Sequence, residues 1–125
     1  GGNVVMLCAE EFQPEVGERP FPPDVDVLCC PLVDEAGHPT RAEARRAVLA
    51  AHQVAGALRL GHRVLVTCAM GRNRSGLVSA LALRVLYPEL SGAEAARRVR
   101  ECRPNALTNP DFSTFLEKIP AHRLT

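Results

Sequence analysis

The sequence predicts an α/β fold with a small, mostly parallel central sheet flanked by helices and a helical C-terminal half. Two observations predict it. In the first half of the chain, short apolar runs typical of buried strands alternate with a pattern of helical period. After the third of these runs, every apolar pattern repeats with the helical period.

Three apolar runs are expected to form the strands. They span residues 4–8, 25–30 and 64–66. Pro31 is expected to end the second strand, because proline has no N–H to donate to a neighbouring strand. The third run is not interrupted by polar residues, so we expect it to be buried on both faces of the sheet.

Capping signals place the first two helices. Thr40 and Glu43 form a capping box that opens a helix running to about Leu60. Gly61 stands where a residue with left-handed backbone usually ends a helix. A second helix is expected from about residue 75 to residue 86, and its nearly all-apolar surface indicates a central position.

Two further helices are expected in the C-terminal part. Ser91 and Glu94 form a second capping box, and the helix that it opens ends near Cys102. Asn109 is expected to cap the last helix, with Pro110 at the first helical position, where a missing N–H costs nothing.

Length and charge limit the architecture and the partners. The 125 residues are the size of one domain, which we expect to span 1–125. The formal net charge is +1, so no overall field attracts nucleic acid or a membrane surface. No apolar run reaches the roughly 18 residues that a membrane helix needs. We expect a cytoplasmic monomer without a membrane partner.

The cysteines favour a reducing compartment. The chain has five, Cys8, Cys29, Cys30, Cys68 and Cys102, an odd number at irregular spacings. They form no Cys-x-x-Cys pair, which excludes a zinc ribbon and a thioredoxin-like site. All except Cys68 are expected to be inert thiols of the core.

Cys68 differs from the others because it belongs to a motif. Arg74 follows it by six residues, Gly71 lies between them, and Ser75 and Gly76 come next. A bare Cys-x5-Arg pair is expected by chance in so Arg-rich a chain, but the added residues make the motif specific. The motif also stands where a strand, a loop and the start of a helix are predicted.

This arrangement is suited to holding a phosphate beside a nucleophile. Backbone N–H groups of the loop and of the helix N-terminus would surround the anion, and Arg74 would bind two of its oxygens. The same positive field favours the thiolate form of Cys68, which is the nucleophile. Ser75 would donate a hydrogen bond to that thiolate when it leaves. The residues expected to line the cradle are Ala69, Met70, Gly71, Arg72, Asn73 and Arg74.

Attack on a phosphate ester also requires an acid that protonates the leaving oxygen and later activates water. We assign this role to Asp34, in the loop that follows the second strand. Glu35 is the nearest rival. Asp26 is the weaker alternative, because it lies within a strand and has little reach.

Val66–Gly76 resembles the signature loop of the cysteine-dependent protein tyrosine phosphatase superfamily, and is most similar to that of the small dual-specificity phosphatases. Pro31–Asp34 resembles the general-acid loop of these enzymes, and Arg103–Phe112 their C-terminal helical segment. The likeness extends over Val4–Leu116. It implies an α/β sandwich of the phosphatase type, a phosphocysteine intermediate, and neither a metal nor another cofactor.

Two departures from the family accompany the resemblance. Thr67 stands where the family has a histidine that orders the loop and helps to keep the thiolate, so we expect reduced or altered activity. The elements that precede the first strand in the family are absent from the chain. No segment suited to building a deep phosphotyrosine pocket is evident, which favours a shallow site.

The expected function is hydrolysis of phosphate monoesters, with phosphorylated Tyr, Ser or Thr of proteins, or a small phosphate ester, as the substrate. One alternative is an RNA 5′-triphosphatase, because Asn73 and Arg74 before Ser75 are also similar to the signature loop of those enzymes. Nucleic acid is otherwise not expected as a partner. Phosphoinositide or nucleotide phosphatases are further alternatives, and Thr67 favours a fourth, a module that binds phosphate without cleaving it.

Overall fold

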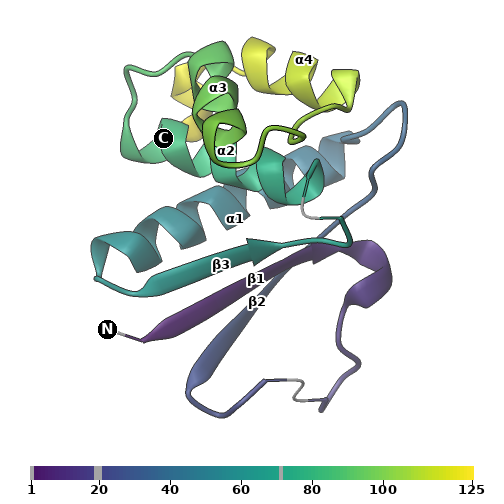
Figure 1. The fold of residues 1–125 in the computed structure, drawn as a ribbon, viewed down its shortest axis with the longest axis vertical. Coiled ribbons are helices and arrows are strands. Elements are labelled where there is room, and N and C mark those ends of the chain that lie inside the picture. Colours follow the sequence, from purple (N-terminus) through teal and green to yellow (C-terminus); the bar gives the residue numbers. More distant parts are fainter. Residues whose placement is uncertain (1, 19–20, 71) are drawn as a thin grey trace.

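The structure is a computed structural model, and it describes residues 2–18, 21–70 and 72–125. Four helices lie on one face of a three-stranded sheet (Figure 1). The strands are β1 (Asn3–Ala9), β2 (Val25–Leu32) and β3 (Arg63–Thr67), and the helices are α1 (Arg41–Arg59), α2 (Arg74–Leu86), α3 (Gly92–Cys102) and α4 (Pro110–Lys118). Two short 3-10 helices, η1 (Glu10–Phe12) and η2 (Ala121–Leu124), follow β1 and α4.

All three strands are parallel, in the order β2-β1-β3. Met6 of the central strand lies opposite Leu28 of β2 and Val66 of β3. Because parallel strands all point the same way, the segments that leave their C-terminal ends meet at one edge of the sheet. These segments are η1, the loop of residues 33–40 before α1, and the loop of residues 68–73 before α2.

The predicted end of the second strand is wrong. β2 continues through Pro31 to Leu32, which is paired with Ala9 beyond a register shift in β1. The physical reason is that β2 lies at the edge of the sheet and pairs with one neighbouring strand only. A proline, which has no N–H to donate, is tolerated in such an edge strand.

The expectation that the third strand is buried on both faces is also wrong. Val64 and Val66 pack against the core, but Leu65 is 60 % exposed. Successive side chains of a strand point to opposite faces. The helices lie on one face of the sheet (Figure 1). Val64 and Val66 pack towards that face, so the side chain of Leu65 is on the other face.

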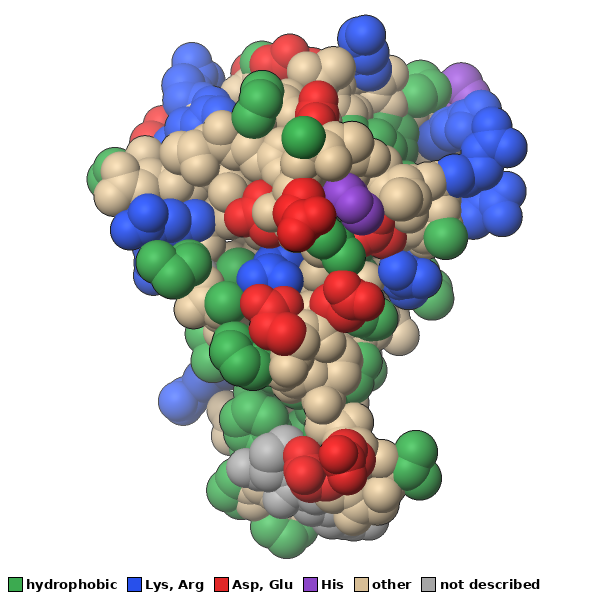
Figure 2. Space-filling model, turned by 90° about the vertical axis from the view of Figure 1, so that its right-hand side faces the viewer, with side chains coloured by type: hydrophobic (Ala, Val, Ile, Leu, Met, Phe, Trp, Pro, Cys, Tyr) green, Lys and Arg blue, Asp and Glu red, His purple; other side chains and the backbone are tan. Residues whose placement is uncertain are grey.

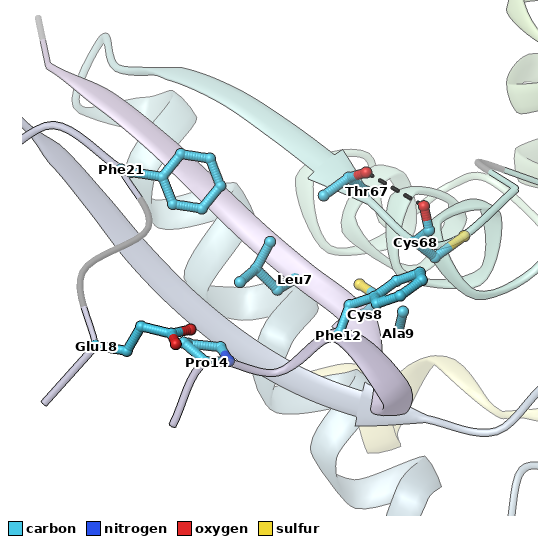
Figure 3. Close-up of a pocket in the computed structure, with 9 residues that line it drawn as sticks. All are labelled: Leu7, Cys8, Ala9, Phe12, Pro14, Glu18, Phe21, Thr67 and Cys68. Carbon is cyan, nitrogen blue, oxygen red and sulfur yellow. Dashed lines mark hydrogen bonds between the residues drawn. The ribbon is translucent and has the colours of Figure 1, made fainter. Parts of the chain in front are cut away.

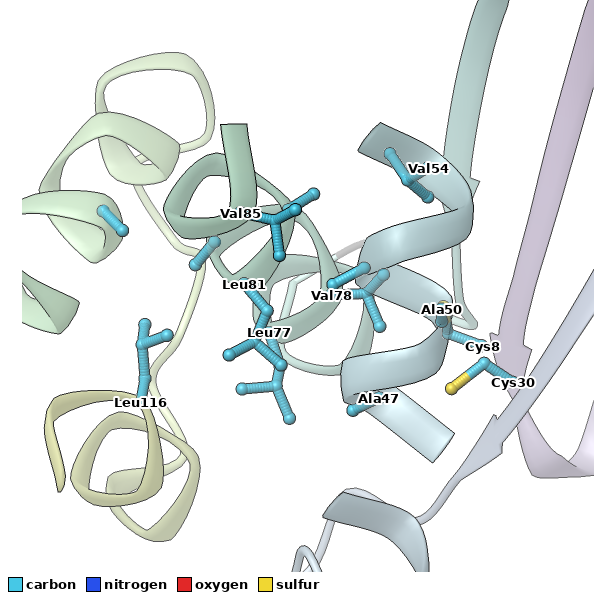
Figure 4. Close-up of a cluster of buried hydrophobic side chains, with 14 of the residues drawn as sticks. Cys8, Cys30, Ala47, Ala50, Val54, Leu77, Val78, Leu81, Val85 and Leu116 are labelled. Carbon is cyan, nitrogen blue, oxygen red and sulfur yellow. The ribbon is translucent and has the colours of Figure 1, made fainter. Parts of the chain in front are cut away.

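The predicted helices are confirmed. The Thr40–Glu43 capping box opens α1, the Ser91–Glu94 box opens α3, and Asn109 caps α4 with Pro110 in its first turn. α2 has the expected central position, because its apolar side chains pack between the small residues of α1 and Leu116 of α4 (Figure 4).

The four cysteines other than Cys68 divide into a buried pair and an exposed pair. Cys8 and Cys30 are buried under α1 (Figure 4), and burial is the main cause that raises the pKa of each thiol, that of Cys30 to about 11. The expectation of core positions is wrong for Cys29, which is exposed on β2, and for Cys102, which is exposed at the end of α3.

No helix within the described residues has the length and apolarity required to cross a lipid bilayer.

Candidate active site

The motif around Cys68 lies at the C-terminal edge of the sheet, between the end of β3 and the start of α2. The Sγ atom of Cys68 is 3.3 Å from Oγ of Ser75, and the backbone N–H of Ser75 donates to Sγ over 3.4 Å. The thiol therefore faces the first turn of α2, where free N–H groups and the helix dipole favour a negative charge. The contact between Ser75 and Cys68 on which the predicted role of Ser75 depends is present.

Arg74 is only 7 % exposed, and much of its hydrogen-bonding capacity is used by the protein. Its Nη1 and Nη2 atoms donate to the two carboxylate oxygens of Glu11 over 2.5 and 3.0 Å, and Nη1 also donates to the Leu32 carbonyl. Hydrogen bonding to Arg74 is the main cause that lowers the pKa of Glu11 to about 2. The same contact raises the pKa of Arg74 above its ordinary value, with smaller contributions from Cys68 and Asp34.

One buried donor of Arg74, its Nε–H, has no partner. Its Nε atom is the one buried side-chain nitrogen or oxygen among the described residues that makes no hydrogen bond. A buried polar group without a partner is costly, and such groups mark places where a ligand or water completes the structure. The carboxylate of Glu11 holds Nη1 and Nη2 of the guanidinium, and Nε is not part of this contact.

Asp34 lies against the loop that follows Cys68. Its Oδ2 atom accepts a hydrogen bond from Nδ2 of Asn73, and its Oδ1 atom accepts one from Nδ2 of Asn109, both over 2.9 Å. Glu35 contributes only its backbone carbonyl, which accepts from Asn109. Asp26 is paired with Val4, near the opposite end of the strands. Of the three candidate acids, Asp34 is the one that the structure brings to the motif.

The loop that carries Asp34 is anchored by a buried carboxylate. Glu43, in the first turn of α1, accepts hydrogen bonds from the backbone N–H groups of Val33 and Thr40 over 2.7 and 2.9 Å, and contacts Nδ1 of His38 at 2.5 Å. Burial opposes ionisation of Glu43, but these hydrogen bonds outweigh it and lower its pKa to about 2. Glu43 therefore fixes this loop just beside Asp34.

Asn109 connects three parts of the site. Its Oδ1 atom caps α4 by accepting from the N–H groups of Asp111 and Phe112, while its Nδ2 atom holds Asp34. Its backbone N–H donates to Oδ1 of Asn73 over 3.0 Å. One residue thus positions Asp34, the loop and the helix relative to one another.

The loop of residues 68–73 is held from outside through its carbonyl groups. The Arg72 carbonyl accepts from the N–H of Leu107 over 3.2 Å, and the Met70 carbonyl accepts from Arg103 over 3.5 Å. These contacts use none of the N–H groups of the loop, which are the donors that an anion cradle requires. Gly71, expected in the middle of the cradle, lies outside the described residues; Ala69, Met70 and Arg72 are exposed.

Leu107 explains why glycine follows Ser75. Leu107 has a left-handed backbone with φ of 57°, which is rare for a bulky residue and is favoured here by its buried side chain. A Cβ atom added to Gly76 would lie 3.2 Å from Cγ of Leu107, closer than side chains usually pack. Gly76 therefore lets the segment that holds Arg72 approach α2.

Thr67 contacts the backbone of Cys68. Its hydroxyl donates to the backbone carbonyl of Cys68 over 3.4 Å (Figure 3). Both residues line a cavity of about 270 Å³ whose other walls are mainly apolar and include Leu7, Phe12 and Phe21 (Figure 3). Within the described ranges, no group of three or more His, Cys, Asp and Glu side chains is placed to hold a metal ion.

Two residues of this site were not predicted from the sequence. Glu11 was not considered, and Asn109 was expected only to cap a helix. The available signal for Glu11 was its position directly after the first strand, because the ends of parallel strands converge. The amide of Asn73 was likewise expected only as part of the cradle, and its contact with Asp34 joins two loops that are far apart in the sequence.

Comparison with known proteins supports the interpretation of the fold. No protein-family model and no curated protein sequence matches the chain. Among solved structures, human DUSP28 superposes with a TM-score of 0.75 and 28 % identity, over 92 % of this chain and 72 % of that one. Tk-PTP in its active form gives 0.67 and 25 %, over 94 % and 80 %.

The Yvh1 phosphatase domain from Chaetomium thermophilum gives a TM-score of 0.67 and 23 % identity, over 93 % of this chain and 76 % of that one, and at this identity shows the fold alone. Together with the geometry around Cys68, these similarities support a phosphatase of this superfamily. The chain has the fold of the small dual-specificity, cysteine-dependent phosphatases.

Proposed function

We propose that the protein hydrolyses phosphate monoesters through a phosphocysteine intermediate on Cys68. The observation that carries the proposal is the buried Nε–H of Arg74, which lacks a partner beside a thiol held at the N-terminus of α2. An anionic oxygen bound there would satisfy the donor and bring phosphorus to the nucleophile.

In the first step, the Cys68 thiolate attacks phosphorus. A sulfur–phosphorus bond forms, the bond from phosphorus to the ester oxygen breaks, and Asp34 donates a proton to that oxygen. Loop N–H groups and Arg74 stabilise the charge on the other phosphate oxygens. The hydrogen bond from Asn73, which holds Asp34 at the loop that follows Cys68, supports this role for Asp34.

In the second step, water attacks the phosphocysteine. The Asp34 carboxylate takes a proton from the water, a new oxygen–phosphorus bond forms, and the sulfur–phosphorus bond breaks. The thiolate that leaves is stabilised by the N–H and hydroxyl groups of Ser75, which lie within 3.4 Å of Sγ. Free phosphate and the original thiolate are the products.

The substrate that we propose is a phosphorylated Tyr, Ser or Thr of a protein. The edge of the sheet that carries the site also carries the exposed acidic side chains of Glu10, Asp34 and Glu35, besides Glu11, whose charge is paired with Arg74. This border repels a polyanion, which disfavours RNA 5′-triphosphate and multiply phosphorylated lipids as substrates. A peptide with a single phosphate has less negative charge than these polyanions, so the acidic border repels it less.

The test is turnover of para-nitrophenyl phosphate by the reduced protein. We expect hydrolysis that Cys68→Ser abolishes, while the variant still binds inorganic phosphate in a titration calorimeter. Absence of turnover by the unmodified protein would contradict the proposal. A panel of phosphopeptides, a phosphoinositide and a 5′-triphosphate RNA then identifies the substrate class.

A second candidate function is binding of phosphate without cleavage. The observation that favours it is the Thr67 hydroxyl, which bonds to a backbone carbonyl. Thr67→His separates the two functions, because the resemblance implies that histidine at this position raises activity. Thr67→Val, which removes only the hydroxyl, is the matched control. Phosphate binding without turnover, by the unmodified protein and by both variants, would establish the second function.

A further inference from the structure

A second concave surface lies between α1 and the C-terminal end of α4, formed by residues outside the candidate active site. This groove has a volume of about 650 Å³, against about 270 Å³ for the cavity beside Cys68. Its floor is apolar, and the half-buried side chains of Val48 from α1 and Phe115 from α4 form part of it. Ala44, Ile119 and Pro120 complete the floor.

Four cations surround this floor. Arg41 and Arg45 come from α1, Lys118 from the end of α4, and Arg123 from η2. All four are exposed, and no acidic residue lines the groove. The groove therefore combines an apolar floor with a positively charged rim.

The charges of the rim are not neutralised within the described part of the chain. The ion pairs found there join His38 to Glu43 and Arg74 to Glu11, and neither involves the rim. Figure 2 shows Lys and Arg side chains gathered at the upper right of the molecule, away from the Asp and Glu side chains near its centre. In a chain whose net charge is only +1, this is a marked local separation of charge.

We propose that the groove binds an acidic protein segment that carries apolar side chains. Like charges placed together without a counter-charge are complementary to an anionic partner, and a half-buried apolar floor is complementary to side chains such as Leu or Phe. An inorganic anion would use only the rim. A flat membrane surface would not reach the floor, because Val48 and Phe115 are half-buried and do not project.

The groove is joined to the candidate active site through the elements that form its walls. α1 begins directly after the loop of Asp34, and α4 lines the groove with its C-terminal end, while Asn109, which holds that carboxylate, caps its N-terminal end. The binding itself does not require the phosphatase chemistry.

The test is fluorescence anisotropy with a fluorescein-labelled peptide in which pairs of Glu alternate with Leu and Phe. We expect the intact protein to bind it at low salt and to bind more weakly as the ionic strength rises through about 0.15 M. The double variant Arg45→Glu, Lys118→Glu reverses two rim charges and is expected to weaken binding about tenfold or more.

The matched control reverses two exposed charges elsewhere. Arg97→Glu, Arg98→Glu on α3 changes the net charge equally and is expected to alter the affinity less than about twofold. Equal weakening by both double variants would overturn the proposal, because the peptide would then be responding to total charge. Unchanged hydrolysis of para-nitrophenyl phosphate, or unchanged phosphate binding, shows that the rim variant is folded.

A second pair of probes tests the floor and the kind of partner. A peptide with Ser in place of every Leu and Phe, but with all its Glu residues, is expected to bind at least about tenfold more weakly. Equal binding would contradict the apolar contact. Co-sedimentation with vesicles of phosphatidylcholine and phosphatidylserine that is lost in the rim variant, without peptide binding, would show a membrane-binding surface and overturn the proposal.

Discussion

Arg74 and Glu11 form an ion pair with two hydrogen bonds, 2.5 and 3.0 Å long, across the C-terminal edge of the sheet. The pair joins the first residue of α2 to the short helix η1, and it leaves Nε of the arginine without a partner. Glu11 thereby fixes the direction of the guanidinium and of its Nε–H, which under the proposed function is oriented before a phosphate binds.

Glu11→Gln tests this positioning. An amide has one acceptor oxygen instead of two and carries no negative charge, so Arg74 is held less firmly and transition-state stabilisation falls. We expect kcat/KM for an aryl phosphate to decrease about tenfold or more. Because hydrogen bonding to Arg74 lowers the pKa of Glu11 to about 2, the effect is expected at every pH above about 4. Glu10→Gln is the control, and a similar loss in both variants would contradict the assignment.

Asp34→Asn tests the assignment of the acid. The amide keeps the size of the side chain but cannot donate a proton to a leaving oxygen. We expect kcat to fall by roughly 10²–10⁴ for alkyl leaving groups and by less for para-nitrophenolate, which needs less protonation. Glu35→Gln is expected to have little effect. If Glu35→Gln causes the larger loss, the acid is the neighbouring residue.

Asn109→Ala is expected to reduce both stability and activity. Loss of the cap on α4 costs about 1 kcal/mol of unfolding free energy, and loss of the Nδ2 contact releases Asp34. Ser91→Ala removes the cap of α3 at a similar cost and touches nothing in the site. The two variants should therefore have similar denaturation midpoints in urea but different kcat values. The same kcat in both would show that Asn109 acts only as a cap.

The lowered pKa of Glu43 predicts that the free energy of unfolding depends on pH. Hydrogen bonds from Thr40, His38 and Val33 outweigh its burial and lower its folded-state pKa to about 2, against 4.5 for the unfolded chain. A lowered pKa gives a contribution that is complete above about pH 5 and is lost as the pH falls towards 2. We expect this contribution to be of the order of 3 kcal/mol.

The measurement is urea unfolding of the unmodified protein and of Glu43→Gln between pH 7 and pH 3. The stability difference between the two should shrink as the pH falls, because the variant lacks the ionisable group. Glu94→Gln in the exposed capping box of α3 is the control, and a smaller change is expected there. A difference that stays constant with pH would show that Glu43 has no lowered pKa.

The sequence predicted those features that depend on neighbouring residues. Thr40 with Glu43, Ser91 with Glu94, and Asn109 with Pro110 cap helices through contacts within three residues, and all three were expected. The strand–loop–helix around Cys68 was predicted for the same reason, since its signals lie within one short segment.

Features that depend on topology were missed. Pro31 is tolerated within a strand because that strand lies at the edge of the sheet. Leu65 is exposed because the helices cover the other face of the sheet. Contacts over long stretches of sequence were missed as well. Glu11 lies 63 residues from Arg74, and Asn109 lies 75 residues from Asp34, so no local pattern reveals either pairing.

The most direct test of the central claim is detection of phosphate on Cys68 itself. In Asp34→Asn, hydrolysis of the intermediate lacks its base, so a rapid acid quench after mixing with para-nitrophenyl phosphate should trap the phosphorylated enzyme. Peptide mapping by mass spectrometry should then place one phosphoryl group on Cys68, and none in the Cys68→Ser, Asp34→Asn double variant. Turnover of the substrate with phosphate on no residue, or on a residue other than Cys68, would contradict the account.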